Sequence, residues 1–335
     1  MSPDVPIQSP TVREISKRRI SYPSSSGEVN INAVVWEPVF DDEDDRPEGI
    51  VQIAHGMVEY IDRYDWYARQ LAAKGYVVAG NDHMGHGDSV NSEDDWGYIP
   101  MEDGDEILVE DVHRLRHDMQ GEYGEDIPYF IQGHSMGSFI VRLYISEYGD
   151  GISGAIIEGT GNPSSASSAL GRGIATIISK FKGDRCRSGL VDGIVLGGYK
   201  NSVPNHKHDN DWLTRDESVV ERYESDPKCT FVFTVAGYHT LLELTGQVVD
   251  EDVIAKVPKS LPILIASGTA DPVGGKNGAG PRQVYQDYKL AGIEDVELKL
   301  YEGARHELHN ELNKEEFVSD VLAWLEEHQE ASYSA

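Results

Sequence analysis

A serine between two glycines is the residue with the clearest chemical potential in the chain. Residues 133–137 read Gly-His-Ser-Met-Gly, a G-x-S-x-G pattern with Ser135 at its centre. The apolar run 128–131 before it indicates a short buried strand, and apolar residues recur at helical spacing after it. Between a strand and a helix, the serine hydroxyl is exposed at the strand end, and the helix N-terminus offers free N–H groups to an oxyanion. The pattern predicts a nucleophile.

A nucleophilic serine needs a base, and that base needs an acid to orient it. Asp271 and His306 each follow an apolar run that predicts a core strand, as Ser135 does. Because the carboxyl ends of parallel strands meet at one edge of a sheet, we expect these side chains to converge. The chain order Ser, Asp, His is the one expected of an α/β-hydrolase. We therefore predict Ser135 as nucleophile, His306 as base and Asp271 as orienting acid.

Two neighbouring residues are alternatives for these roles. Glu158 also ends a predicted strand and is a rival acid, while His309 is a rival base one helical turn after His306. Taken alone, His306 could be a surface histidine, since the chain has 12, and Asp271 could be a turn former. The joint occurrence of the three types at strand ends, in this order, favours the catalytic interpretation.

The oxygen that becomes negative during acyl transfer requires two N–H donors. We predict the amide of Met136, directly after the serine, and the amide of Met57, in the loop after the third predicted strand. Gly56 of the same loop is a predicted substrate contact. His83 and His86 have the spacing of metal ligands, but no Cys/His cluster accompanies them. We expect no metal and no cofactor.

The order of the predicted elements gives the fold class. An antiparallel hairpin comes first, and strands and helices then alternate, which predicts a mostly parallel central sheet flanked by helices, the α/β-hydrolase fold. The alternation stops between residues 159 and 258, where Gly/Ser linkers and short helical patterns predict a mostly helical cap. The expected organisation is core 1–158, cap 159–258 and core 259–335. Ile178 and Phe233 of the cap are predicted substrate contacts.

Composition excludes several classes of function. The net charge of −29 repels nucleic-acid phosphates and anionic membranes, so we expect no nucleic-acid partner. No signal peptide is recognisable and no 18-residue apolar run occurs, so we expect a cytoplasmic protein without a membrane span, with at most transient lipid-surface contact through the cap. Cys186 and Cys229 are expected to be free thiols, although a bridge between them stays open. The sequence leaves the oligomeric state undetermined.

Several motifs together resemble one family. Residues 55–64 resemble its H-G-x-x-E…R-Y element, residues 82–89 its D-x-x-G-H-G-x-S segment, and residues 133–137 its G-H-S-M-G elbow. With the acid and histidine loops at 271–273 and 303–307, the chain is similar to the monoacylglycerol lipase and lysophospholipase group of α/β-hydrolases. The resemblance covers about residues 30–160 and 260–328. It departs at Ser138, where a second glycine often follows the elbow, and is loose in the cap.

This resemblance implies hydrolysis of a small-molecule acyl ester. We expect a serine esterase that acts through an acyl-enzyme on a monoacylglycerol or similar ester, with the acyl chain held under the cap. A lysophospholipase, a thioesterase or an aminopeptidase on the same fold is the alternative among enzymes. A non-catalytic binding protein of the same fold is the alternative from another class, but binding alone does not require Ser135, Asp271 and His306 together.

Overall fold

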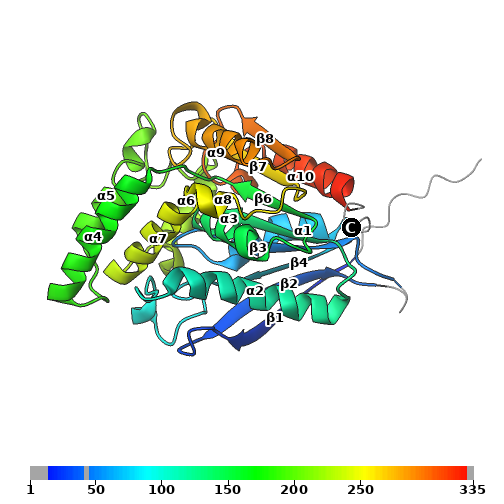
Figure 1. Ribbon diagram of the computed structural model, residues 1–335, viewed down its shortest axis with the longest axis horizontal. Coiled ribbons are helices and arrows are strands. Elements are labelled where there is room, and N and C mark those ends of the chain that lie inside the picture. Colours follow the sequence, from blue (N-terminus) through cyan, green and yellow to red (C-terminus); the bar gives the residue numbers. More distant parts are fainter. Residues whose placement is uncertain (1–13, 41–44, 330–335) are drawn as a thin grey trace, which may run out of the picture.

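A single eight-stranded sheet forms the centre of the protein. The computed structural model describes residues 14–40 and 45–329. The strands lie in the order β1-β2-β4-β3-β5-β6-β7-β8 (Figure 1). They are β1 (Ile15–Pro23), β2 (Asn30–Pro38), β3 (Gly49–Ala54), β4 (Tyr76–Asn81), β5 (Tyr129–His134), β6 (Gly154–Glu158), β7 (Ile263–Gly268) and β8 (Val296–Tyr301). The hairpin β1–β2 is antiparallel and β2 is antiparallel to β4, whereas all pairs from β4 to β8 are parallel. The predicted fold class is confirmed.

Burial explains why the sequence forms this sheet. Every residue of β3, β4, β5, β6 and β7 is buried, as expected for strands covered on both faces, and these segments are short apolar runs. In β8, at the edge, exposed and buried residues alternate. The parallel strands therefore present their carboxyl ends at one shared edge of a rigid scaffold.

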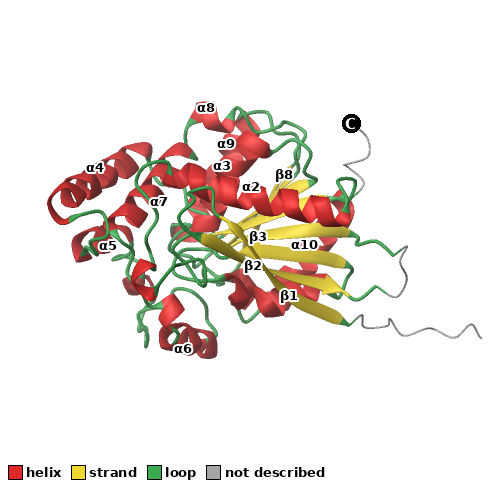
Figure 2. Ribbon diagram, turned by 90° about the horizontal axis from the view of Figure 1, so that it is seen from below, coloured by secondary structure: helices red, strands yellow, loops and turns green. Residues whose placement is uncertain are grey.

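Helices cover both faces of the sheet (Figure 2). One apolar cluster joins one face to α1 (Asp65–Ala72) and α10 (Lys314–His328). The other face packs against α2 (Gly104–Tyr123), α3 (Met136–Tyr148) and α9 (Ala279–Leu290). A 3-10 turn at Ile61–Tyr64 directly precedes α1.

The stretch 159–258, for which a cap is predicted, is helical. All its residues are described, and none of them belongs to a strand. Its α-helices are α4 (Ser165–Lys182), α5 (Gly189–Val195), α6 (Glu217–Ser225), α7 (Val235–Gln247) and α8 (Glu251–Ile254). The helices α4 and α5 form one end of the molecule, at the left of Figure 1.

Two further expectations concern the cysteines and the membrane. Cys186 is half-buried and Cys229 is buried, and both are free thiols, as predicted. Within residues 14–40 and 45–329, no helix combines the length and the apolar character that crossing a bilayer demands.

Candidate active site

Ser135 occupies a sharp corner between β5 and α3. Its φ of 54° and ψ of −118° lie in a region that residues other than glycine rarely adopt. The flanking glycines make the corner feasible: a Cβ on Gly133 would collide with the Gly137 carbonyl, and a Cβ on Gly137 would collide with the carbonyl of Ala54. The Ser135 amide donates to the Glu158 carbonyl at 3.0 Å. The sheet on one side and the buried helix on the other hold the strained residue in place.

Ser138, the departure from the family pattern, fits this corner without a glycine. Its side chain is fully buried, and its hydroxyl donates to the Ser135 carbonyl at 2.5 Å. The bond ties the first turn of α3 to the nucleophile corner. The residue therefore adds a polar contact at a position where the family often has a glycine.

His306 and Asp271 form a buried pair. Nδ1 of His306 lies 2.9 Å from Oδ2 of Asp271, and both side chains are almost fully buried in the loops after β8 and β7. A carboxylate only accepts, so Nδ1 carries the proton and Nε2 stays available as an acceptor. Burial lowers the pKa of His306, but the charge and hydrogen bond of Asp271 outweigh it, so the pKa lies above its usual value.

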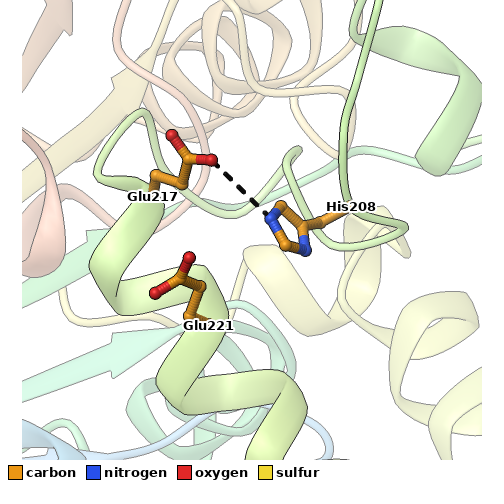
Figure 3. Close-up of side chains that lie close together, drawn as sticks. All are labelled: His208, Glu217 and Glu221. Carbon is orange, nitrogen blue, oxygen red and sulfur yellow. Dashed lines mark ion pairs between the residues drawn. The ribbon is translucent and has the colours of Figure 1, made fainter.

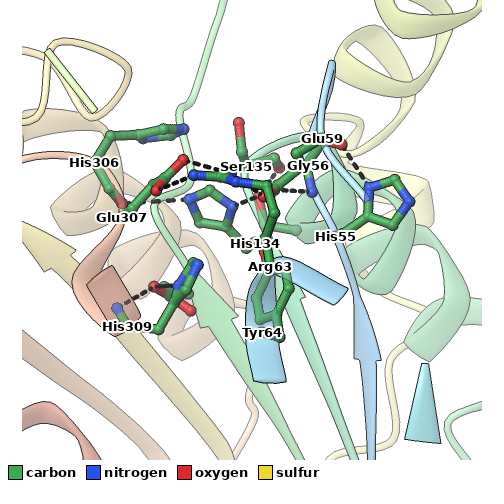
Figure 4. A network of polar contacts seen from close by, with 12 residues as sticks. His55, Gly56, Glu59, Arg63, Tyr64, His134, Ser135, His306, Glu307 and His309 are labelled. Atoms are coloured by element: carbon green, nitrogen blue, oxygen red, sulfur yellow. Dashed lines mark hydrogen bonds and ion pairs between the residues drawn. The ribbon is translucent and has the colours of Figure 1, made fainter. Parts of the chain in front are cut away.

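The rival residues form a separate pair. Glu158 Oε1 lies 2.8 Å from Nδ1 of His309, and Gln132 donates to Glu158 Oε2 at 2.8 Å. Both side chains of the Glu158–His309 pair are fully buried, and His309 stacks on Tyr64 at 4.3 Å between ring centroids. Figure 4 shows His309 apart from His306 and Ser135. Of the two carboxylates, the structure therefore places Asp271, and not Glu158, on His306.

The loop after β3 brings one predicted oxyanion donor to the serine. Met57 and Met136 both line the cavity that Ser135 opens into. Within the described part of the chain, the amide of neither residue has a hydrogen-bond acceptor. The Gly56 amide is already engaged, since it donates to Oε1 of Glu59 at 2.5 Å. The two free amides are thus the ones available to an oxygen bound beside Ser135.

A buried network around Glu59 holds this loop (Figure 4). Oε1 of Glu59 also contacts Nδ1 of His134 at 2.9 Å and accepts from the Tyr64 hydroxyl at 3.0 Å, while Oε2 accepts from Arg63 at 2.6 Å. Arg63 in turn donates two bonds to Glu307, at 2.8 and 2.7 Å. Burial raises the pKa of Glu59, but the bonds and charges of His134 and Arg63 prevail and hold it well below its usual range.

The Glu59 network joins the oxyanion loop, the nucleophile corner and the histidine loop. Sequence reasoning assigned no role to Glu59, Arg63 or Glu307. The signal was present in the H-G-x-x-E…R-Y element and in the Glu after His306, but the network becomes evident only when β3, β5 and β8 lie in one sheet.

His83 and His86, which have metal-like spacing, lie in a buried cluster of histidine rings. His55 Nε2 accepts from the His83 amide at 3.0 Å, and the three rings of His55, His83 and His86 pack together. His55 Nδ1 also contacts the Gly56 carbonyl at 2.7 Å, within the loop after β3. Burial lowers the pKa of His83 well below its usual value, which keeps the ring neutral.

Two groups of side chains among the described residues could ligate a metal; one consists of Asp295, Glu297 and His328, and the other lies at α6. His208, Glu217 and Glu221 lie close together on and beside α6 (Figure 3). Glu217 accepts from Lys207 at 2.7 and 2.8 Å, and His208 Nδ1 contacts Glu224 at 2.9 Å. Because a lysine ammonium already neutralises Glu217, we interpret the cluster as a surface ion-pair network.

A cavity of about 840 Å³ lies over the strand ends. Ser135, His306 and Gly56 line it on the sheet side. The walls contributed by residues 159–258 combine polar side chains, such as Asp192, Asn210 and Thr230, with a set of apolar ones: Ile194, Val195, Leu196, Phe231, Val232, Leu241 and Leu242. Its volume and lining suit a ligand with an extended apolar part.

The two predicted cap contacts lie outside this lining. Phe233 is fully buried and packs against Phe231, Tyr238 and His86. Ile178 packs into the apolar core. Phe231, two residues before Phe233, lines the cavity instead. Apolar character alone did not reveal which cap side chains face the ligand space and which support it.

Comparison with known proteins agrees with this geometry. The family described as serine aminopeptidase, S33 (Hydrolase_4) matches residues 45–313. The chain belongs to this family. It is therefore a hydrolase of the α/β-hydrolase superfamily.

Relatives and solved structures match over most of their lengths. The chain is 29% identical over 305 residues to a monoacylglycerol lipase of Mycolicibacterium smegmatis, covering 90% of this chain and 95% of the relative. It is 30% identical over 296 residues to the monoglyceride lipase of Rattus norvegicus, covering 87% and 84%. A thermostable carboxyl esterase of Bacillus coagulans, solved with glycerol, superposes with a TM-score of 0.84 at 28% identity, covering 93% of this chain and 99% of the other.

Proposed function

We propose that the protein hydrolyses a carboxylic ester through an acyl-enzyme. The observation that carries the proposal is the Asp271–His306 pair, which opens onto the same cavity as the strained Ser135. Nε2 of His306 takes the hydroxyl proton as Ser135 attacks the ester carbonyl carbon, and then returns it to the leaving alcohol. Water, activated by the same nitrogen, breaks the acyl bond and releases the acid. Asp271 fixes the imidazole and stabilises its charged form.

The amides of Met57 and Met136 are the proposed oxyanion donors. Preorganised N–H groups stabilise charge that develops only in the transition state, so they need no reorganisation during the reaction. Glu59 supports this role, because its bond to the Gly56 amide fixes the loop directly before Met57.

A monoacylglycerol or similar neutral acyl ester is the proposed substrate. The apolar walls suit an acyl chain, and the relatives at 29–30% identity are named monoacylglycerol and monoglyceride lipases. Among the described residues that line the cavity, Lys200 is the sole lysine or arginine, and it pairs with Asp209 at 3.2 Å. Arg172, Lys180 and Arg185, basic residues of the cap, are not part of the lining. The cavity therefore offers no unpaired cation to an anionic head group, which favours a neutral one over a lysophospholipid.

A substrate panel with an active-site probe tests the proposal. A fluorophosphonate should label Ser135, and wild type should turn over monoacylglycerols faster than thioesters, lysophospholipids and aminoacyl amides of comparable size. Ser135→Ala should abolish both labelling and turnover. Labelling at another serine would contradict the assigned nucleophile, and faster cleavage of the aminoacyl amides would contradict the assigned substrate class.

A further inference from the structure

Arg142 is a buried cation on α3, the helix that begins directly after the nucleophile. The residue is 2% exposed. Burial lowers the pKa of Arg142 below its usual value, and Tyr288 and Asp287 offset this effect only in part. Burying a charge is costly unless hydrogen bonds compensate for the lost water. The guanidinium donates to four neutral acceptors: the Thr160 hydroxyl at 3.3 Å, the Gly161 carbonyl at 2.9 Å, the Asn162 side-chain oxygen at 3.3 Å and the Val248 carbonyl at 3.0 Å.

These acceptors lie at the ends of two cap helices, α4 and α7. Residues 160–162 come between β6 and α4, and Val248 directly follows α7. Nη1 of Arg142 bonds to Thr160 and Gly161, whereas Nη2 bonds to Asn162 and Val248. One guanidinium therefore joins the segment that enters α4 to the residue that leaves α7.

The two helices also contact one another near these ends. They lie side by side in Figure 1. The Ser168 hydroxyl lies 2.9 Å from that of Thr245, and a Cβ on Gly171 would lie 2.9 Å from a methyl group of Leu242. Small residues thus let α4 and α7 pack closely, and Arg142 lies where this helix pair starts and ends. We call residues 160–162 and Val248 the base of the pair.

The base of the pair lies beside the candidate active site. Gly161, Asn162 and Thr245 line the cavity that Ser135 opens into. Gly161 also packs against the acid loop, since a Cβ there would come within 2.9 Å of the Val273 carbonyl. A displacement of residues 160–162 would therefore move the cavity wall next to that loop.

We propose that Arg142 is a positioning residue, which holds the base of the α4–α7 pair against the nucleophile helix and so fixes a wall of the substrate cavity. The planar guanidinium suits this role because its fork presents several donors in fixed directions. A long acyl chain reaches more of the wall than a short one, so its binding should depend more on the anchor. This effect on substrates rests on the proposed ester hydrolysis, whereas the anchoring itself does not.

Arg116 on α2 supplies a matched control. It is also buried, and its guanidinium donates to the backbone carbonyls of Tyr148, Asp150 and Gly151 at 2.9, 3.1 and 3.0 Å. These carbonyls lie at the end of α3 and in the turn after it, outside the stretch 159–258. Methionine in place of either arginine keeps an unbranched apolar stem and removes the fork, so the two variants differ in which segment they release.

Hydrogen exchange measured by mass spectrometry tests the anchoring on chains that carry Ser135→Ala. The amide of Ser168 bonds to the Ser164 carbonyl and that of Val248 to the Leu244 carbonyl, so both report on the base of the pair. In Arg142→Met these two amides should exchange at least tenfold faster than in the parent chain. In Arg116→Met they should exchange at the parent rate. An equal acceleration of the β5 amides in Arg142→Met would show that the arginine only stabilises the whole fold.

Ester turnover by the chain that retains Ser135 tests the consequence for substrates. Arg142→Met should raise KM for a long-chain ester about tenfold relative to a short-chain ester of the same head group, with kcat changing less than threefold. Arg116→Met should leave this ratio unchanged. Arg142→Lys keeps the charge but replaces the fork by one ammonium group, so it should behave like Arg142→Met.

Four results would overturn the proposal. They are parent-like exchange at Ser168 and Val248 in Arg142→Met, the equal acceleration in β5, the same change of the KM ratio in both methionine variants, and a wild-type ratio in Arg142→Lys. A wild-type protein that cleaves no ester would instead refute the proposed function, and hydrogen exchange would still decide whether Arg142 anchors the helix pair.

Discussion

Replacing Asp271 by asparagine removes one charge from the candidate site and keeps the shape of the side chain. The bond that changes is the one of 2.9 Å between Oδ2 and Nδ1 of His306. A hydrogen bond to a charged group contributes about 1.5–3 kcal/mol, which corresponds to about 10- to 150-fold in rate. An asparagine amide can also donate to Nδ1, which moves the imidazole proton to Nε2, where the ring no longer serves as a base. We expect kcat to fall by about 10³- to 10⁴-fold.

The Glu158–His309 pair supplies the matched control. Its two side chains are fully buried and 2.8 Å apart, so Glu158→Gln removes a similar charge close to the same corner. We expect this variant to keep kcat per folded molecule within a few-fold of wild type and to lose about 3 kcal/mol of unfolding free energy, since it leaves His309 buried without its counter-ion.

The stability loss should depend on pH in a defined direction. The pKa of His309 is raised above 6.5 because the charge of Glu158 and the hydrogen bond to it outweigh burial, which lowers it. The contribution of His309 to folding stability is therefore present at pH values below its unfolded-state pKa. It disappears as the pH rises through its folded-state pKa. The pKa of Glu158 is lowered below 4.5, because His309 outweighs the effect of burial, which raises it. The contribution of Glu158 therefore disappears as pH falls. Urea denaturation should show a larger loss in Glu158→Gln at pH 6 than at pH 9.

Turnover of a soluble ester and urea denaturation, measured on both variants, separate the two roles. Asp271→Asn should lose activity with a small change in stability, and Glu158→Gln the reverse. If Glu158→Gln lost three orders of magnitude in kcat while Asp271→Asn stayed active, the pairing seen in the structure would not be the catalytic one.

Three further predictions concern the base, the cavity and the loop. Because His306 acts as a neutral base and Asp271 outweighs burial in raising its pKa, the acid limb of the kcat/KM profile should lie above pH 6.5. Phe231→Ala should lower kcat/KM for long-chain relative to short-chain esters by about 10-fold, because Phe231 lines the cavity. Phe233→Ala removes a fully buried ring, so it should leave that ratio unchanged and reduce the free energy of unfolding by about 3–5 kcal/mol. Glu59→Gln should reduce kcat by about 10- to 100-fold with little change in KM, because the Gly56 amide loses a charged acceptor. An unchanged kcat would show that other contacts hold the loop.

The core of the fold was predictable because each of its elements carries its own local signal. The parallel strands β3 to β7 are buried on both faces, so each is a compact apolar run of five or six residues, which is too short for a typical core helix. Residues such as Ser135 follow these strands directly, so parallel pairing alone places them at one edge.

Two features could not be read from sequence for physical reasons. The Glu59 network joins side chains up to 248 residues apart, from Glu59 to Glu307, and hydrogen bonds between loops leave no periodic pattern in either loop. The cap lacks a sheet to set its register. Phe231 and Phe233 have the same residue type and both contact His86, yet Phe231 lines the cavity, whereas Phe233 is fully buried against Tyr238.

The electrostatic effect of the net charge is another property that the sequence alone does not determine. A value of −29 predicts repulsion from anionic membranes only if the charges act together, yet a charge in water at physiological ionic strength acts over about 8 Å. What a partner meets is the charge of the nearest surface. Inside the cavity that surface carries Lys200 paired with Asp209. We therefore expect the head-group preference to follow the lining of the cavity more than the net charge of the chain. A neutral ester should be cleaved faster than an anionic ester of the same acyl chain, and equal rates for the two would contradict this reasoning.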